Sequence, residues 1–547
     1  MHGRSRDFSW RNPYLKKKLS VPFGGDHSEK SALFEVHDVQ DMRAAARMCY
    51  EHDICLVVRG EGSGYTAGAY NFGSGLVMDT THMNRVLDLD ASKGTITVEP
   101  GITISDLRET ALSVGWDMRQ FPTTSVAGHP ATLGGFLQTA QYGIGSARYG
   151  STFDFGNIID MKVVSLTRES PIVSLDGVMD AKKMSGVLRS LGTSAIVSEV
   201  TLALAPAQYW VDVGICFPTF AGAVDFAMST HRLPTIELRE LSVFPSSILT
   251  ASLNSGERKS HIHFLRNKIP TLNHTPNQRI EREKALIHPG VDEQLYEMPE
   301  HVEETEALVI LSVNEASLPF LNHNVKARGG HTVYIEHNRG GYGFIEAATW
   351  QHAATRLSKY YSGVQYSHFE MDLGPVDGKT IRDVTARMDL VKLLLNTSLV
   401  QKEEYEALLE SRALESASNS PLPTRTMDED HDRWVDERQL ATDDIRFRPA
   451  WFFEFITRED GSSGLIAQLN FRTQTENFVQ MERRLQNTTS ALAGFMRGRE
   501  LESFVDPHQH HPDFIFVEPN SDHMSQRRAA KSLFDPKGLL NPRELQT

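Results

Sequence analysis

The sequence predicts a protein of two or three domains that contain both helices and strands. Three observations lead to this prediction. The chain has 547 residues, whereas one domain usually has roughly 100 to 200 residues. The first two hundred residues alternate rapidly between helix-like and strand-like patterns. Two glycine-rich segments, at 59–79 and 123–150, interrupt this alternation.

The elements of the first part follow one another closely. Asp38, with Asp41 three residues later, is typical of a helix N-cap and its first turn, so a helix is predicted in VQDMRAAARMCYEHD. The strand ICLVVR follows and leads directly into the first glycine-rich segment. Strand-like GLVMD, VLDLD and TITVEPG come next, and a helix from Thr103 is expected to end at Gly115. Strands in NIIDMKVVSLT and AIVSEVTLALAP close this part.

Composition excludes several classes of protein. The chain has 56 Lys and Arg against 70 Asp and Glu, a formal net charge of −14, which disfavours a general affinity for nucleic acid or anionic lipid. No apolar run approaches the roughly 18 residues of a membrane helix, and the basic N-terminus lacks the apolar region of a secretory signal. Cys49, Cys55 and Cys216 are too few for a disulfide framework. We therefore expect a cytoplasmic protein with core thiols, no membrane span and no nucleic-acid partner.

The first glycine-rich segment, RGEGSGYTAGAYNFGSGLVMD, has two interpretations. Glycine-rich turns between strands are common and need no ligand. The segment also lacks the GxGxxG spacing and the Lys-Ser/Thr pair of the usual nucleotide loops, which disfavours a nicotinamide-linked dehydrogenase. Its backbone N–H groups are free of Cβ obstruction, however, and could wrap the two phosphates of a dinucleotide.

Five ordered segments together resemble the FAD-linked oxidases of the vanillyl-alcohol oxidase / p-cresol methylhydroxylase (PCMH) superfamily. RGEGSGYTAG is similar to the pyrophosphate loop of that family. The other four segments are VLDLDASKGTITVEPGITISDL, ATLGGFLQTAQYGIGSARYGSTFDFGNIIDMKVVSLT, LGTSAIVSEVTLALAP and the C-terminal SLFDPKGLLNPREL. The resemblance covers roughly residues 30–206 and 506–547.

The resemblance implies an α+β fold of two main domains. After an N-terminal extension (1–29), residues 30–206 would form a PCMH-type FAD-binding domain of two α/β subdomains. Residues 207–505 would form a substrate or cap domain, an antiparallel sheet flanked by helices, and 506–547 would return to the FAD-binding domain. Strand-like HTVYIEH and WFFEFITR and helix-like GFIEAATWQHAATRLSKYY fit the expected cap.

The resemblance also assigns residues to FAD. The phosphate loop would use the main chain of Arg59, Gly60, Glu61, Gly62, Ser63, Gly64, Tyr65, Gly68 and Ala69. The ribityl chain and ring would meet Pro122, Thr123, Thr124, Thr132, Gly134 and Gly135 on one side and Gly145, Ser146 and Val197 on the other, with Asn541 below.

Non-covalent FAD is expected. Ser63 stands where tethered relatives have a histidine, and TTSVAGHPATLGG lacks the companion cysteine of doubly tethered ones. Attachment through His352 or through the group His508, His510 and His511 stays open. That group is too closely packed for a metal motif, so no metal is expected.

The implied activity is transfer of a hydride from a small alcohol, hydroxy acid, phenol or amine to flavin N5. Such a reaction needs a proton acceptor and often an anion-binding cation, and the candidates for these tasks are His352, Tyr366 and Arg339. The electron acceptor would be oxygen or a redox partner, and a homodimer through the cap is the analogy for assembly. The alternative is a flavin-binding structural or partner subunit without turnover of its own.

Overall fold

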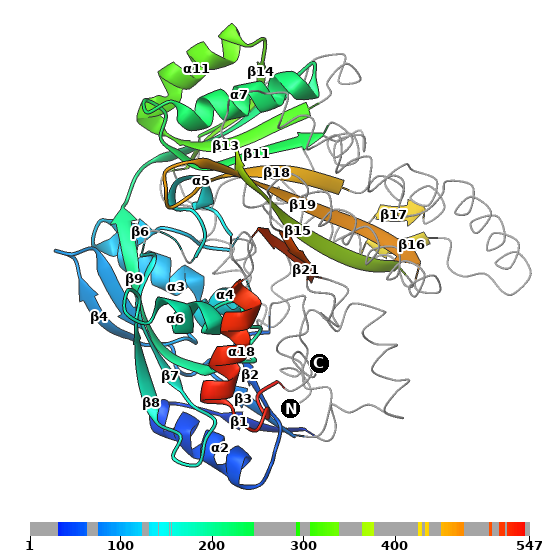
Figure 1. The fold of residues 1–547 in the computed structure, drawn as a ribbon. Coiled ribbons are helices and arrows are strands. Elements are labelled where there is room, and N and C mark those ends of the chain that lie inside the picture. The colour runs from blue at the N-terminus through cyan, green and yellow to red at the C-terminus, as the bar shows by residue number, and fades with distance from the viewer. Residues whose placement is uncertain are drawn as a thin grey trace, which may run out of the picture.

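The computed structural model describes most of the first half of the chain and parts of the second. The described residues are 31–62, 75–122, 131–139, 142–152, 154, 156–245, 292–295, 307–338, 364–376, 425–428, 433–436, 450–474, 503–505, 514–519 and 522–541. They form a first domain of two small sheets and a second domain around one large sheet (Figure 1).

The first sheet is small and parallel. Its strands are β1 (Ser31–Glu35), β2 (Leu56–Arg59) and β3 (Gly75–Asp79), in the order β1-β3-β2. Helix α2 (Val39–Glu51) begins as predicted, because the Asp38 side chain accepts hydrogen bonds from two backbone N–H groups of the first turn. The buried side of α2 carries Cys49, one of the three free cysteines.

The second sheet is antiparallel and has the order β4-β5-β9-β7-β8, with β6 paired to β9. Its strands are β4 (Val86–Asp90), β5 (Thr95–Val98), β6 (Trp116–Met118), β7 (Ile158–Val164), β8 (Ile172–Asp176) and β9 (Ile196–Pro206). The described helices between these strands are α3 (Ile104–Ser113), α4 (Leu133–Thr139), α5 (Ser146–Tyr149) and α6 (Ala181–Val187). The predicted limits of α3 are confirmed, since Thr103 caps its start and Gly115 follows its end with φ +83°.

The large sheet has the order β12-β14-β10-β13-β11-β18-β19-β15-β21-β20. The strands are β10 (Trp210–Phe217), β11 (Leu238–Pro245), β12 (Asp292–Leu295), β13 (Ala307–Asn314), β14 (His331–Asn338), β15 (Val364–Val376), β18 (Ala450–Thr457), β19 (Ser463–Gln474), β20 (Ser503–Val505) and β21 (Phe514–Pro519). All of the pairings are antiparallel except that of β15 with β21. A separate hairpin joins β16 (Arg425–Asp428) to β17 (Arg433–Asp436).

Helices α7 (Phe220–Arg232) and α11 (Leu318–Ala327) cover one face of the large sheet, above it in Figure 1. The buried side of α7 carries Val224, Phe226 and Ala227. The first domain lies on the other side of the sheet, and the short helix α5 contacts β11 and β18.

The C-terminal helix α18 (Asp522–Phe534) packs against α6 of the first domain. Leu540, after the end of α18, is fully buried in the core beneath the parallel sheet. The segment 506–547 is therefore divided in space, because β21 belongs to the large sheet whereas α18 and the tail lie on the first domain. Among the described helices, none is long and apolar enough to cross a membrane.

Candidate cofactor-binding site

The two glycine-rich segments meet at Gly60 and Thr132. Gly60 directly follows β2, and Thr132 directly precedes α4. A Cβ added at Gly60 would lie 2.2 Å from Thr132 Oγ1, far inside van der Waals contact. Only glycine therefore allows the main chain at position 60 to approach the second segment this closely.

The first loop turns sharply just after this contact. Gly62 has φ +66°. A Cβ added at Gly62 would lie 2.5 Å from Nη2 of the Arg59 guanidinium. The Arg59 carbonyl accepts hydrogen bonds from Thr80 N at 2.9 Å and Thr80 Oγ1 at 3.0 Å. The end of β2 is thereby fixed to the end of β3, which holds the start of the loop in place.

The second segment is fixed to the turn before α3. Gly134 N donates to Pro100 O at 2.8 Å, and Leu133 N donates to Ile102 O at 2.9 Å. A Cβ on Gly134 would lie 2.9 Å from Pro100 Cβ. Gly135 N donates to Thr132 Oγ1 at 3.3 Å, so the hydroxyl that faces Gly60 also holds the start of α4.

Farther along the second segment, Gly145 joins the two domains. Its φ is +112°, and an added Cβ would lie 1.9 Å from Arg119 O. Gly145 N donates to the carbonyl of Arg239 on β11 at 3.0 Å. Ser146, which follows, is fully buried at the start of α5. This part of the segment thus lies directly against the large sheet.

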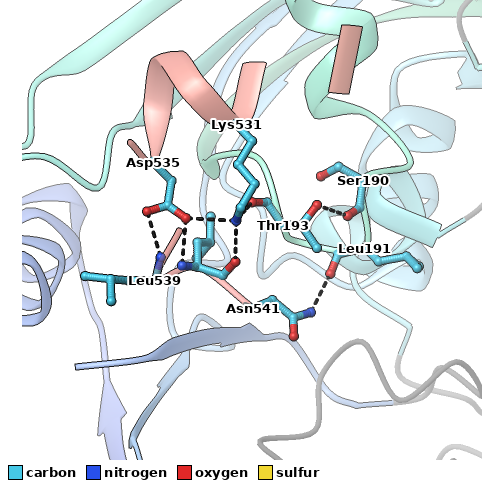
Figure 2. Close-up of polar contacts among 8 residues, drawn as sticks. Ser190, Leu191, Thr193, Lys531, Asp535, Leu539 and Asn541 are labelled. Atoms are coloured by element: carbon cyan, nitrogen blue, oxygen red, sulfur yellow. Dashed lines mark hydrogen bonds and ion pairs between the residues drawn. The ribbon is translucent and has the colours of Figure 1, made fainter. Parts of the chain in front are cut away.

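The C-terminal tail reaches the same region from the other side (Figure 2). Asn541 N donates to Leu56 O at the start of β2, at 2.8 Å, and Asn541 Nδ2 donates to Leu191 O at 2.9 Å. Lys531 Nζ pairs with Asp535 at 2.9 Å and donates to Leu540 O at 2.8 Å. These contacts tie the tail to the strand that leads into the first loop.

The first domain is similar in sequence to known FAD-binding proteins. Residues 31–167 match the model of a family described as the FAD binding domain. The first domain is therefore similar to FAD-binding domains over these residues. D-lactate dehydrogenase of Anaerostipes hadrus is 30% identical over 181 residues, which cover 32% of this chain and 36% of that protein. Glycolate oxidase subunit GlcD of Bacillus subtilis is 28% identical over 185 residues, 33% of this chain and 38% of that protein. The chain thus spans little more than a third of the length of these curated relatives.

Solved structures resemble the chain over a much larger part. Alkyldihydroxyacetonephosphate synthase has a TM-score of 0.58 at 13% identity and covers 94% of this chain and 77% of its own. 6-Hydroxy-D-nicotine oxidase from Arthrobacter nicotinovorans has a TM-score of 0.50 at 11% identity and covers 96% of this chain and 94% of its own. The α+β fold, with a FAD-binding domain beside an antiparallel sheet, is therefore confirmed.

The residues present fit FAD. At Gly60, Gly62 and Gly134 a Cβ would collide with neighbouring atoms of the protein, so glycine allows the close packing that brings the main chains of the two segments together. A diphosphate bound by backbone N–H groups needs such an approach. Val197, 5% exposed, lies on β9 beside β7, and Pro122 follows Phe121, whose main chain pairs with Ile144 in both directions.

Several predicted residues lie outside the described part of the chain. From the FAD set these are Ser63, Gly64, Tyr65, Gly68, Ala69, Thr123 and Thr124, and from the catalytic and histidine candidates they are Arg339, His352, His508, His510 and His511. Tyr366 lies on β15, between β19 and β21 of the large sheet. The catalytic candidates and the individual FAD contacts stay predictions.

The sequence interpretation missed a set of buried polar residues on the large sheet. Asp212, Arg239, Glu240 and Ser312 are all 6% exposed or less. Burial raises the pKa of Glu240 to about 7, and nearby Asp212 adds to this effect against the opposing influence of Ser242 and Arg239. The signal was present as charged residues inside mainly apolar runs, Asp212 in WVDVGICF and Arg239 with Glu240 in LRELSVFP.

Proposed function

We propose that the protein is an FAD-dependent oxidoreductase that oxidises a small hydroxy acid. The observation that carries this proposal is the contact of the two glycine-rich segments at Gly60 and Thr132 within a domain of the FAD-binding family. The names of the relatives support the substrate class, since they include D-lactate dehydrogenase, a glycolate oxidase subunit and, in Xanthomonas citri, D-2-hydroxyglutarate dehydrogenase.

FAD would supply the acceptor for the hydride. The main chain at Gly60 and Gly62 would bind the cofactor's phosphates. Gly134, whose N–H donates to Pro100 O, would hold the second segment beside them, and Gly145 would hold that segment against the large sheet. The proposed division of labour is that 30–206 binds FAD, whereas 207–505 encloses the substrate. Arg339 would bind the carboxylate, and His352 with Tyr366 would handle its proton.

Non-covalent FAD, a homodimer and transfer of electrons to oxygen or to a redox partner belong to the same proposal. A structural subunit without turnover is the weaker alternative, because the named relatives are dehydrogenases and an oxidase subunit.

Anaerobic reduction of the bound flavin tests the proposal. The purified yellow protein is mixed with D-lactate, L-lactate, glycolate, D-2-hydroxyglutarate and L-2-hydroxyglutarate in turn, and the flavin absorbance is followed. We expect at least one of these acids to bleach the flavin, and subsequent admission of air or of a dye to restore the colour. If dithionite bleaches the flavin but every hydroxy acid leaves it oxidised, the assignment of this substrate class is wrong.

A further inference from the structure

Three polar side chains lie in one row across the middle of the large sheet. In the strand register Asp212 of β10 faces Ser312 of β13, and Ser312 faces Glu240 of β11. Directly paired residues of antiparallel strands project from the same face. The row therefore belongs to one face of the sheet.

A register shift adds an arginine to this face. Leu238 and Glu240 pair with consecutive residues of β13, so Arg239 is the extra residue of a β-bulge. Its Nη2 lies 3.9 Å from Asp212 Oδ1, and its guanidinium lies 5.6 Å from the centre of the Phe121 ring. Because the Arg239 carbonyl accepts from Gly145 N, this face borders the second FAD segment.

The opposite face of the same strands is apolar. Val213, Leu241 and Leu311 occupy alternating positions and are at most 1% exposed, on the side covered by α7. An antiparallel sheet normally turns its polar face to water. Here the polar face is enclosed as well, with Asp212 0% and Ser312 1% exposed.

Within the described part of the chain, Glu240 and Ser312 of this row each have one side-chain oxygen without a hydrogen-bond partner. Glu240 Oε1 accepts from Ser242 Oγ at 2.7 Å, but Glu240 Oε2 and Ser312 Oγ are buried and unpaired. Buried polar atoms are nearly always paired in native proteins, so unpaired ones need a reason such as a ligand or a catalytic task. A hydroxyl group placed beside Glu240 and Ser312 would satisfy both atoms.

We propose that Glu240 binds the substrate hydroxyl, together with Ser312, and accepts its proton during oxidation. This inference rests on the proposed function. The C–H bond breaks and its electron pair leaves as a hydride to the flavin. The O–H bond breaks, its electron pair completes the new C=O bond, and the proton moves to the Glu240 carboxylate. The products are a keto acid, reduced flavin and protonated Glu240.

The charges around Glu240 suit a group that both takes up and releases a proton. Asp212 lies on β10, Arg239 precedes Glu240 on β11, and Glu454 of β18 faces Ser242. Burial raises the pKa of Glu240, with a further contribution from Asp212, whereas Arg239 and the Ser242 hydroxyl oppose this rise. A proton acceptor works best when its pKa lies near the working pH. Glu240 would therefore take up the hydroxyl proton, the task for which the sequence suggested His352 and Tyr366.

The test compares Glu240→Gln with Glu109→Gln, an exposed glutamate on α3. Anaerobic bleaching is measured by stopped flow from pH 5 to 9 with the hydroxy acid that reduces the wild type fastest. We expect the rate of Glu240→Gln to fall about 10²-fold or more, with loss of the rise through neutral pH. Glu109→Gln should match the wild type. Equal rates and pH profiles in all three proteins would overturn the proposal.

A second readout needs no substrate. The absorbance of the bound flavin is titrated over the same pH range in the wild type and in both variants. We expect a spectral shift through neutral pH that is absent only in Glu240→Gln. A shift with no bleaching by any hydroxy acid would support Glu240 beside the flavin and reject the substrate class, whereas an identical titration in all three proteins would reject Glu240. If Glu240→Gln does not bind FAD, Glu240→Asp is tested in its place. Its shorter carboxylate should keep the spectral shift through neutral pH and lower the rate of flavin bleaching.

Discussion

His231 is expected to make the joint between the two domains sensitive to acid. This residue lies near the end of α7, is partly buried and touches both domains. Its Nε2 lies 3.1 Å from the Ala147 carbonyl of α5, and its Nδ1 lies 2.8 Å from Ser463 Oγ of β19. Because a carbonyl only accepts, Nε2 carries the hydrogen and Nδ1 accepts from the Ser463 hydroxyl. Since burial lowers the pKa of this ring, it is neutral at pH 7 and Nδ1 acts as the acceptor.

The magnitude follows from the pKa of this ring. Burial lowers the pKa of His231 from 6.5 to about 4, against the opposing influence of the Ala147 contact. The unfolded chain binds more protons than the folded one between these values, so stability is complete above pH 6.5 and falls as the pH drops toward 4. One pKa unit corresponds to about 1.4 kcal/mol. The loss should be about 2 kcal/mol between pH 7 and pH 5, and about 3 kcal/mol in total.

The perturbation that isolates this effect is His231→Gln, which keeps a side-chain N–H donor and removes the titration. Urea unfolding is followed by tryptophan fluorescence from pH 5 to 8, with His323→Gln, an exposed histidine of α11, as the control. The wild type and His323→Gln should lose about 2 kcal/mol more than His231→Gln between pH 7 and pH 5. Parallel pH curves for all three proteins would refute the reasoning, because they would mean that His231 titrates alike in the folded and unfolded chains.

Three further predictions concern the FAD-binding domain. Gly60→Ala should weaken FAD binding at least about tenfold, because the new Cβ would meet Thr132 Oγ1. Titration of the protein with FAD measures the affinity. The double variant Gly60→Ala/Thr132→Ala should recover part of the lost affinity. Arg108→Met should lower the free energy of unfolding by about 3–5 kcal/mol, since Asp117 would lose its buried partner at 2.9 Å. Urea unfolding measures this loss. The double variant Arg108→Met/Asp117→Asn should be more stable than the single variant. Asp535→Asn should accelerate FAD release and lower stability by about 3 kcal/mol, because Asp535 holds the tail; flavin fluorescence after dilution follows the release.

Each of these predictions has an outcome that contradicts it. Unchanged FAD affinity in Gly60→Ala would mean that the two glycine-rich segments move apart freely. Equal stability of Arg108→Met and the wild type would show that Asp117 finds another partner. An unchanged rate of FAD release after Asp535→Asn would show that the residues beyond α18 do not contribute to the site.

Local signals in the sequence were sufficient for the FAD-binding domain. The cap at Asp38 and the glycine after α3 are each determined by a few neighbouring residues, and the structure has them where they were predicted. The strand predicted in ICLVVR is present as Leu56–Arg59.

The polar row on the large sheet could not be predicted in the same way. Its position depends on a single register shift at Arg239, which is decided by how β11 pairs with β13 and not by local preference. The same is true of β21, which joins the large sheet beside β15 although the tail that follows it lies on the other domain. Long-range pairing of this kind leaves no periodic mark in the chain.

The absorbance spectrum of the purified protein, recorded before and after acid precipitation, tests the central claim most directly. We expect the two flavin bands in the native protein and their complete transfer to the supernatant, with the chromatographic mobility of FAD. Yellow colour that stays in the pellet would contradict non-covalent binding. A colourless protein that takes up no FAD, although Gly60 and Thr132 are intact, would contradict the site itself.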